Sequence, residues 1–249
     1  MAEVVFAQQY LQTALSILQQ IVRDESKGID AAAELIVESL AADGVLHVFG
    51  SGHAHLFAEE LAYRAGGLAP VNPIVDYGYT LMGGSASRST RLERLEGYAI
   101  TQLQSYDLRK GEVLLAVSQS GINPGPVEAA LFAKEKGLHV VAVTSLAHSG
   151  NLPSRHSSGK RLFEIADVVI DSHVPMGDAL VELRPGIPKV SPGSTAVGAA
   201  ILQALVAEVA SRLLQRGIQP PVWISSNVPG GDEHNLRLAE KYPSRLKAF

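Results

Sequence analysis

Four short runs of apolar, β-branched residues recur along the chain and constrain its fold more than any other feature. These runs cover residues 45–50, 112–118, 139–145 and 166–171. They are mostly apolar on both faces, which is typical of strands buried in a parallel sheet. A fifth strand is predicted at about 70–76, and helices are predicted between the strands at 54–65, 92–105, 125–136 and 195–215. This alternation predicts an α/β fold, a three-layer αβα sandwich around a parallel five-stranded sheet.

The sequence before and after this region predicts two additions to the sandwich. Apolar residues at helical spacing predict two helices near the N-terminus, at 3–24 and 29–42. We expect them to form an N-terminal helical hairpin that occupies residues 1–42. The sandwich domain then takes residues 43–215. The remaining residues, 216–249, are expected to form a C-terminal extension that packs on the domain or on a neighbouring subunit.

Composition excludes several classes of protein. With 46% hydrophobic and 18% charged residues, the chain is predicted to fold around a large core. The net charge of −4 comes without a basic block, so neither nucleic acid nor an anionic membrane is an expected partner. The absence of cysteine removes disulfides, thiolate zinc sites and cysteine nucleophiles. No apolar run reaches the ~18–20 residues that span a bilayer, and the first residues lack a targeting pattern, so a soluble, cytoplasmic protein is expected.

Three loops that combine glycine with hydroxyl side chains lie at predicted strand-to-helix junctions or helix starts. The residues concerned are Gly50, Ser51, Gly52 and His53, then Ser118, Gln119, Ser120, Gly121 and Asn123, and finally Ser194 and Thr195. In open α/β sheets, ligands bind where strands lead into helix N-termini. Glycine lets backbone N–H groups approach an anion, and helix starts add free donors. Each loop alone is also compatible with an ordinary helix cap or turn. Together they predict a phosphate site.

Competing motifs are missing or weak. A dinucleotide fingerprint would need glycine where His55 stands, and no G-x-x-x-x-G-K-[ST], G-x-S-x-G or H-E-x-x-H motif occurs. Two stretches rich in Gly, Ser and Arg, 77–91 and 148–161, are predicted to be long exposed loops. The loop histidines His53, His55, His148 and His156 have irregular spacing, which is weak evidence for a metal. We therefore predict neither a metal site nor a cofactor.

The order and spacing of these segments resemble the SIS (sugar isomerase) domain family over roughly residues 30–215. The segment Ser118–Gly121 is similar to the phosphate loop in the isomerase half of glucosamine-6-phosphate synthase. This resemblance implies a flavodoxin-like strand order, a homodimer, and a phosphorylated sugar facing Ser118, Gln119, Ser120 and Asn123. The segment Ser191–Ala204 resembles a helix start of arabinose-5-phosphate isomerases. The whole chain, with its tail motif at 230–235, resembles a bacterial branch of sugar or phosphoheptose isomerases within the family.

The resemblance also suggests catalytic residues. The segment Phe57–Leu61 is similar to a helix of phosphoheptose isomerases in which the carboxylate corresponding to Glu60 transfers protons. His234 follows Pro229 by five residues, close to where arabinose-5-phosphate isomerases carry a histidine. Our hypothesis is an aldose–ketose isomerase that acts through an enediol, with Glu60 and His234 exchanging protons. A sugar-phosphate lyase or etherase and a non-catalytic sugar-phosphate sensor are the alternatives.

Overall fold

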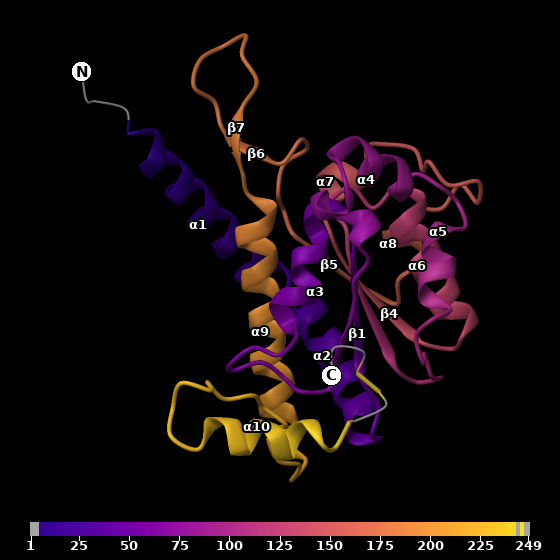
Figure 1. Cartoon of the computed structure of the whole chain (residues 1–249). Coiled ribbons are helices and arrows are strands. Elements are labelled where there is room, and N and C mark those ends of the chain that lie inside the picture. Colours follow the sequence, from indigo (N-terminus) through magenta and orange to yellow (C-terminus); the bar gives the residue numbers. More distant parts are fainter. Residues whose placement is uncertain (1–4, 243–244, 247–249) are drawn as a thin grey trace.

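The computed structural model describes residues 5–242 and 245–246. Five parallel strands form the central sheet in the order β2-β1-β3-β4-β5, which confirms the predicted α/β sandwich (Figure 1). The strands are β1 (Leu46–Gly50), β2 (Val71–Ile74), β3 (Val113–Val117), β4 (His139–Thr144) and β5 (Val168–Asp171). The last residue of β1, Gly50, is in register with the last residue of β3, Val117. The loops that follow these two strands therefore start side by side.

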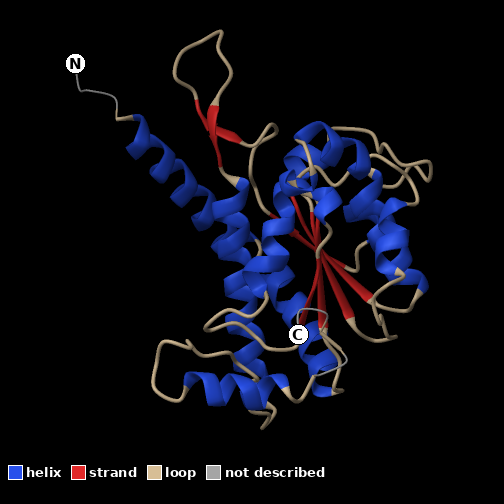
Figure 2. Cartoon of the chain, viewed as in Figure 1, coloured by secondary structure: helices blue, strands red, loops and turns tan. Residues whose placement is uncertain are grey.

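Helices cover both faces of the sheet (Figure 2). One face packs against α2 (Ser26–Ala41), α3 (Leu56–Leu61) and α9 (Ser194–Gln215) in the larger apolar cluster. The other face packs against α5 (Tyr98–Leu103), α6 (Pro124–Glu135) and α8 (Leu162–Ile165). Both faces of β3 are buried, since Leu115 joins the first cluster and Leu114 the second. This explains why the strand sequences are apolar at every position.

The two predicted N-terminal helices are present, as α1 (Phe6–Asp24) and α2. They differ from the predicted hairpin because the single residue Glu25 separates them and they follow one another end to end (Figure 1). While α2 packs on the sheet, α1 projects beyond it and leaves apolar side chains such as Leu11, Leu15 and Val22 exposed. The Tyr10 hydroxyl donates to the carbonyl of Pro192, 3.1 Å away.

The structure divides the segments between the strands differently from the prediction. The stretch 77–91 contains the short turns η2 (Tyr77–Tyr79) and η3 (Leu81–Gly83) and most of α4 (Ala86–Glu93). The predicted helix at 92–105 is interrupted: α4 ends at Glu93, and α5 starts after its N-cap, Gly97, which has the non-helical φ of +86°. The predicted helix at 54–65 begins as η1 (Gly52–His55), continues as α3 and ends at Leu61.

Beyond β5 the chain contains elements that the sequence pattern did not predict. A two-stranded antiparallel hairpin, β6 (Ala179–Val181) and β7 (Val190–Pro192), leads into α9. Before β5, the short helix α7 (Leu146–Ser149) overlaps the start of the predicted loop at 148–161, and the rest of that loop up to α8 is irregular. Strands of three residues are too short to show an alternating pattern, so β6 and β7 left no periodic signal.

Residues 216–242 pack on the sandwich of the same chain. The isolated bridge between Leu68 and Val222 and the burial of Trp223, which is 1% exposed, fix the start of the extension. Its helix, α10 (Gly231–Ala239), lies at the C-terminal end of α9 (Figure 1). At the end of the sheet where the strands begin, Arg245 forms an ion pair with the buried carboxylate of Glu112.

Helix α9 is a core helix of this fold. Among the described residues it alone is long and apolar enough, by composition, to cross a membrane. Its face toward the sheet is buried, including Val197, Ile201 and Leu205. The helix contacts α2 along much of its length, so its apolar character is accounted for by packing within the sandwich.

Gly198 allows α9 to approach the ring of Phe57. A Cβ at this position would lie 2.5 Å from the ring Cζ, and Phe57 is 5% exposed. Alanine gains about 1 kcal/mol over glycine in a helix, but overpacking a core costs about 1–3 kcal/mol. We expect Gly198→Ala to lower the free energy of unfolding by about 1 kcal/mol in urea titrations. An unchanged or raised value would show that the Phe57 ring moves aside without cost.

Candidate functional site

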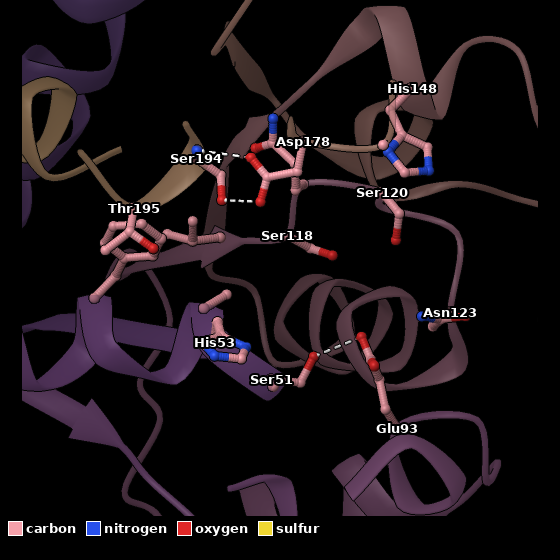
Figure 3. Close-up of a pocket in the computed structure, with 16 residues that line it drawn as sticks. Ser51, His53, Glu93, Ser118, Ser120, Asn123, His148, Asp178, Ser194 and Thr195 are labelled. Atoms are coloured by element: carbon pink, nitrogen blue, oxygen red, sulfur yellow. Dashed lines mark hydrogen bonds between the residues drawn. The ribbon is translucent and has the colours of Figure 1, made fainter. Parts of the chain in front are cut away.

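The three predicted loops meet at one cavity at the carboxyl ends of β1 and β3 (Figure 3). The cavity has a volume of about 320 Å³. Its lining residues are Ser51, Gly52, His53, Ala54, Phe57, Glu93, Val117, Ser118, Gln119, Ser120, Asn123, His148, Gly177, Asp178, Ser194 and Thr195. Of the predicted binding residues, Gly50 and Gly121 are not part of this lining, although they belong to its loops. The structure therefore brings together segments that are about 70 residues apart in the sequence.

The first loop is shaped by glycine. A Cβ on Gly50 would lie 2.1 Å from the carbonyl oxygen of Ala54, so a larger residue would push the turn away from the strand end. Gly52 has a φ of +59°, which other residues rarely adopt. The Ser51 hydroxyl donates to a carboxylate oxygen of Glu93 at 2.9 Å. The exposed His53 side chain completes this wall of the cavity.

The second loop is a tight turn into α6. The backbone N–H of Gly121, whose φ is +60°, donates to the Ser118 Oγ at 3.2 Å. Asn123 stands at the N-cap of α6, and its Oδ1 accepts a hydrogen bond from Arg155 Nη1 at 2.9 Å. The half-buried Ser120 side chain faces the cavity (Figure 3). This loop combines hydroxyl donors, the positive end of the α6 dipole and a nearby guanidinium, which suits an anion. Pro124 and Pro126 have no N–H, so the hydroxyls and the guanidinium would supply most of the donors.

The third loop already holds a carboxylate of the protein itself. Asp178 accepts hydrogen bonds from the backbone N–H groups of Gly193 and Ser194, at 3.0 and 2.8 Å, and from the Ser194 hydroxyl at 2.7 Å. Figure 3 shows the two Ser194 bonds. Asp178 thus caps the N-terminus of α9 and compensates its dipole. The sequence predicted that Ser194 binds a phosphate, but its backbone N–H and its hydroxyl both donate to Asp178.

Three ionisable residues of the cavity were not among the predicted site residues. Glu93 ends α4, Asp178 precedes β6, and His148 lies on α7. Burial lowers the pKa of His148 below its usual value, as does the charge of Arg155, while Asp178 opposes the shift. The imidazole is therefore neutral at pH 7, and its Nδ1 is buried without a hydrogen-bond partner in the described part of the chain.

The predicted catalytic pair lies outside the lining of this cavity. Glu60 forms an ion pair with Arg64 and accepts a hydrogen bond from Gln203 Nε2 at 3.0 Å. His234 lies on α10, and its Nε2 is 2.9 Å from the carbonyl oxygen of Val222. Since α10 lies at the C-terminal end of α9 and the cavity at its N-terminal end, His234 lies away from the cavity of its own protomer (Figure 1).

The SIS domain family model matches residues 9–145, more than half of the sequence. The chain belongs to the SIS domain family. Close relatives span almost the whole of this SIS protein. A UPF0309 protein of Caldanaerobacter subterraneus subsp. tengcongensis is 46% identical over 241 residues, which cover 96% of this chain and 98% of the relative. A UPF0309 protein of Halalkalibacterium halodurans is 43% identical over 237 residues, covering 95% and 94%.

Solved structures share the fold of this SIS protein at low sequence identity. Phosphoheptose isomerase GmhA from Neisseria gonorrhoeae matches with a TM-score of 0.55 and 20% identity, over 82% of this chain and 97% of that one. The Vibrio vulnificus NanR protein complexed with ManNAc-6P matches with a TM-score of 0.50 and 19% identity, over 86% and 65%. At these identities the likeness establishes the fold. Activity has to be argued from the cavity itself.

Proposed function

We propose that this SIS protein binds a phosphorylated sugar in the cavity, with the phosphate at the Ser118–Asn123 loop. The observation that carries the proposal is the meeting of three glycine- and hydroxyl-bearing loops at one cavity. The second loop is the best phosphate site, because the Ser120 hydroxyl faces the cavity at the start of α6 and Arg155 lies behind Asn123. The cavity of about 320 Å³ is large enough for a small sugar phosphate.

We further propose that the protein is an aldose–ketose isomerase acting through an enediol. The reaction needs a base that takes the proton from the hydroxyl-bearing carbon beside the carbonyl and an acid that protonates the carbonyl oxygen, which gives the enediol. The base then returns its proton to the former carbonyl carbon, while the acid regains a proton from the hydroxyl that becomes the new carbonyl. Glu93 and neutral His148 are the groups of this cavity that suit these roles. Proton transfer of this kind requires no redox cofactor.

A non-catalytic sensor of sugar phosphates is the second candidate. It is favoured by the position of Glu60 and His234, the two residues that the family resemblance offered as catalysts, outside the cavity of their own protomer. The sensor and the isomerase share the same binding step and differ in turnover. A homodimer is part of both proposals, and the exposed apolar residues of α1, Leu11, Leu15 and Val22, support it.

Binding is tested first with a panel of pentose, hexose, heptose and amino-sugar phosphates. A ligand at about 100 times its dissociation constant should stabilise the protein by about 2.7 kcal/mol in thermal unfolding. We expect Ser120→Ala to weaken binding of the best ligand about 10–150-fold, because a hydrogen bond to a charged group contributes about 1.5–3 kcal/mol. Ser211→Ala, an exposed serine on α9, is the matched control. No response to any member of the panel contradicts the proposal.

A further inference from the structure

A second group of ionisable side chains lies outside the candidate cavity. It consists of Glu96 in the turn before α5, Glu128 on α6 and His156 in the loop 148–161. The His156 Nε2 is 3.8 Å from Glu96 Oε2 and 3.8 Å from Glu128 Oε1. Among the described residues, one ligand atom from each of the three lies within 4.8 Å of the others. Three segments distant in sequence therefore converge on one point.

Among the described residues, the buried Glu128 carboxylate has no permanently charged partner, and its ion-pair contact is His156. The residue is 3% exposed, and its Oε1 accepts one hydrogen bond, from the backbone N–H of Gly97 at 2.5 Å. Its Oε2 is buried with no hydrogen-bond partner in the described part of the chain. The nearby Tyr79 hydroxyl is likewise buried and unpartnered, and its pKa is raised by burial and then by the charge of Glu128. An isolated buried carboxylate is costly, so this site favours a cation.

The other two side chains are held in position by the same loop. Glu96 accepts hydrogen bonds from the backbone N–H and the hydroxyl of Ser157, both at 2.7 Å. The His156 Nδ1 lies 2.8 Å from the Ser158 hydroxyl oxygen and accepts a hydrogen bond from the Ser158 backbone N–H at 3.1 Å. These contacts fix the ring with Nε2 facing the two carboxylates. Since Nδ1 accepts, the ring proton is on Nε2, and a metal bound there would displace it.

The spacing and type of these groups fit a transition metal. A tetrahedral ion about 2.0–2.2 Å from each ligand atom sets the ligand atoms roughly 3.4 Å apart, so the observed 3.8 Å separations need only a small contraction. An imidazole together with carboxylates favours Zn²⁺ or a similar ion over Mg²⁺ or Ca²⁺, which prefer oxygen ligands alone. We propose that Glu96, Glu128 and His156 form a zinc-type divalent metal site with an open fourth position.

Such an ion would fasten the loop 148–161 to α6 beside the candidate cavity. Arg155, the neighbour of His156, donates to Asn123 at the N-cap of α6, and His148 at the start of the same loop lines the cavity. The metal would therefore hold one wall of the cavity in place without itself facing the ligand. This role is structural, and the proposal is independent of the proposed function.

The test is a calorimetric titration of the chelator-treated full chain with Zn²⁺, followed by Co²⁺ as a spectroscopic probe. We expect one tight equivalent, with visible Co²⁺ absorption typical of a low coordination number. His156→Gln and Glu96→Gln should each weaken this equivalent at least about 100-fold, the upper range seen for outer-shell changes at metal sites. His139→Gln, a histidine at the start of β4, is the control and should retain it.

Several outcomes would overturn the proposal. Absence of a tight equivalent would mean that His156 contacts the two carboxylates with no metal between them. A tight equivalent that survives both substitutions, and is lost in His53→Gln, would place the metal in the candidate cavity instead. His156 and Glu96 lie in surface segments, so their variants are expected to fold, and circular dichroism of each variant checks this. Glu128→Gln is used only as a third variant, because Glu128 is buried in the core and its substitution can also affect folding.

Discussion

Glu93→Gln is expected to lower turnover of the best-binding sugar phosphate by about 10²–10⁴-fold while leaving its dissociation constant nearly unchanged. The amide keeps the size of the side chain and can still accept the hydrogen bond from Ser51, but it cannot take a proton. General acid–base catalysis contributes a factor of this size. Steady-state kinetics and calorimetry on the same preparation measure the two quantities separately.

Two comparison variants make this result decisive. Glu240→Gln alters a carboxylate on the exposed side of the C-terminal extension and should leave turnover as it is. Glu60→Gln tests the assignment drawn from the family resemblance. Turnover lost in Glu60→Gln and kept in Glu93→Gln would move proton transfer to Glu60 and contradict our assignment. Binding without turnover in the unaltered protein would favour the sensor.

Glu112→Ala is expected to lower the free energy of unfolding by about 3–5 kcal/mol, the largest stability effect we predict. Glu112 is 3% exposed and lies between the buried His47, whose Nε2 is 2.9 Å away, and Arg245. It also accepts the backbone N–H groups of Val45 and Arg109 at 3.1 and 2.9 Å. Removing the carboxylate leaves these donors and two basic groups without their partner. Urea unfolding at pH 7 measures the loss.

The same carboxylate gives stability a pH dependence. Burial alone would raise the pKa of Glu112, but hydrogen bonds from His47, from the Arg109 backbone and from Arg245 outweigh burial and lower it. The unfolded chain therefore binds a proton at higher pH than the folded chain does. Stability from this group is present above the ordinary value near 4.5 and is lost as the pH falls through the lower, folded pKa.

The pH series on Glu112→Ala and on Asp24→Asn separates this buried group from surface charge. Asp24 pairs with Arg23 at the exposed end of α1, where water screens the pair. We expect Asp24→Asn to follow the unaltered protein, and Glu112→Ala to lose the acid-dependent part of the curve. A curve for Glu112→Ala that is merely shifted down, with its shape unchanged, would assign the acid sensitivity to other carboxylates.

The sheet and the position of the candidate cavity could be predicted from the sequence because both depend on local signals. Strands such as 113–117 are buried on both faces, so every residue in them is apolar. The carboxyl ends of parallel strands lie at the same edge of the sheet. That reasoning predicted that Ser51, Ser118 and Ser194 lie together. It holds even though each serine alone is an ordinary capping residue.

The ionisable residues of the cavity could not be predicted in the same way. Asp178 reaches Ser194 across 16 residues, through a hairpin whose strands are too short to show a pattern. The sequence pattern predicts one helix over 92–105, but Glu93 is the last residue of α4, and a separate helix, α5, begins after Gly97. The direction of the Glu93 side chain therefore could not be predicted from that helix. Glu60 illustrates the opposite case, since its sequence neighbourhood resembles a catalytic helix while Arg64 and Gln203 hold its carboxylate outside the cavity.

The aspartate at the start of α9 gives the cavity an electrical polarity. One side, at the start of α9, carries the Asp178 carboxylate, and the other, at the start of α6, has the Arg155 guanidinium behind Asn123. A molecule with a single doubly charged end is repelled from the first side and drawn to the second, whatever its carbon skeleton. Its uncharged end is thereby turned toward the acidic wall, so orientation is set before any contact with an individual hydroxyl is made.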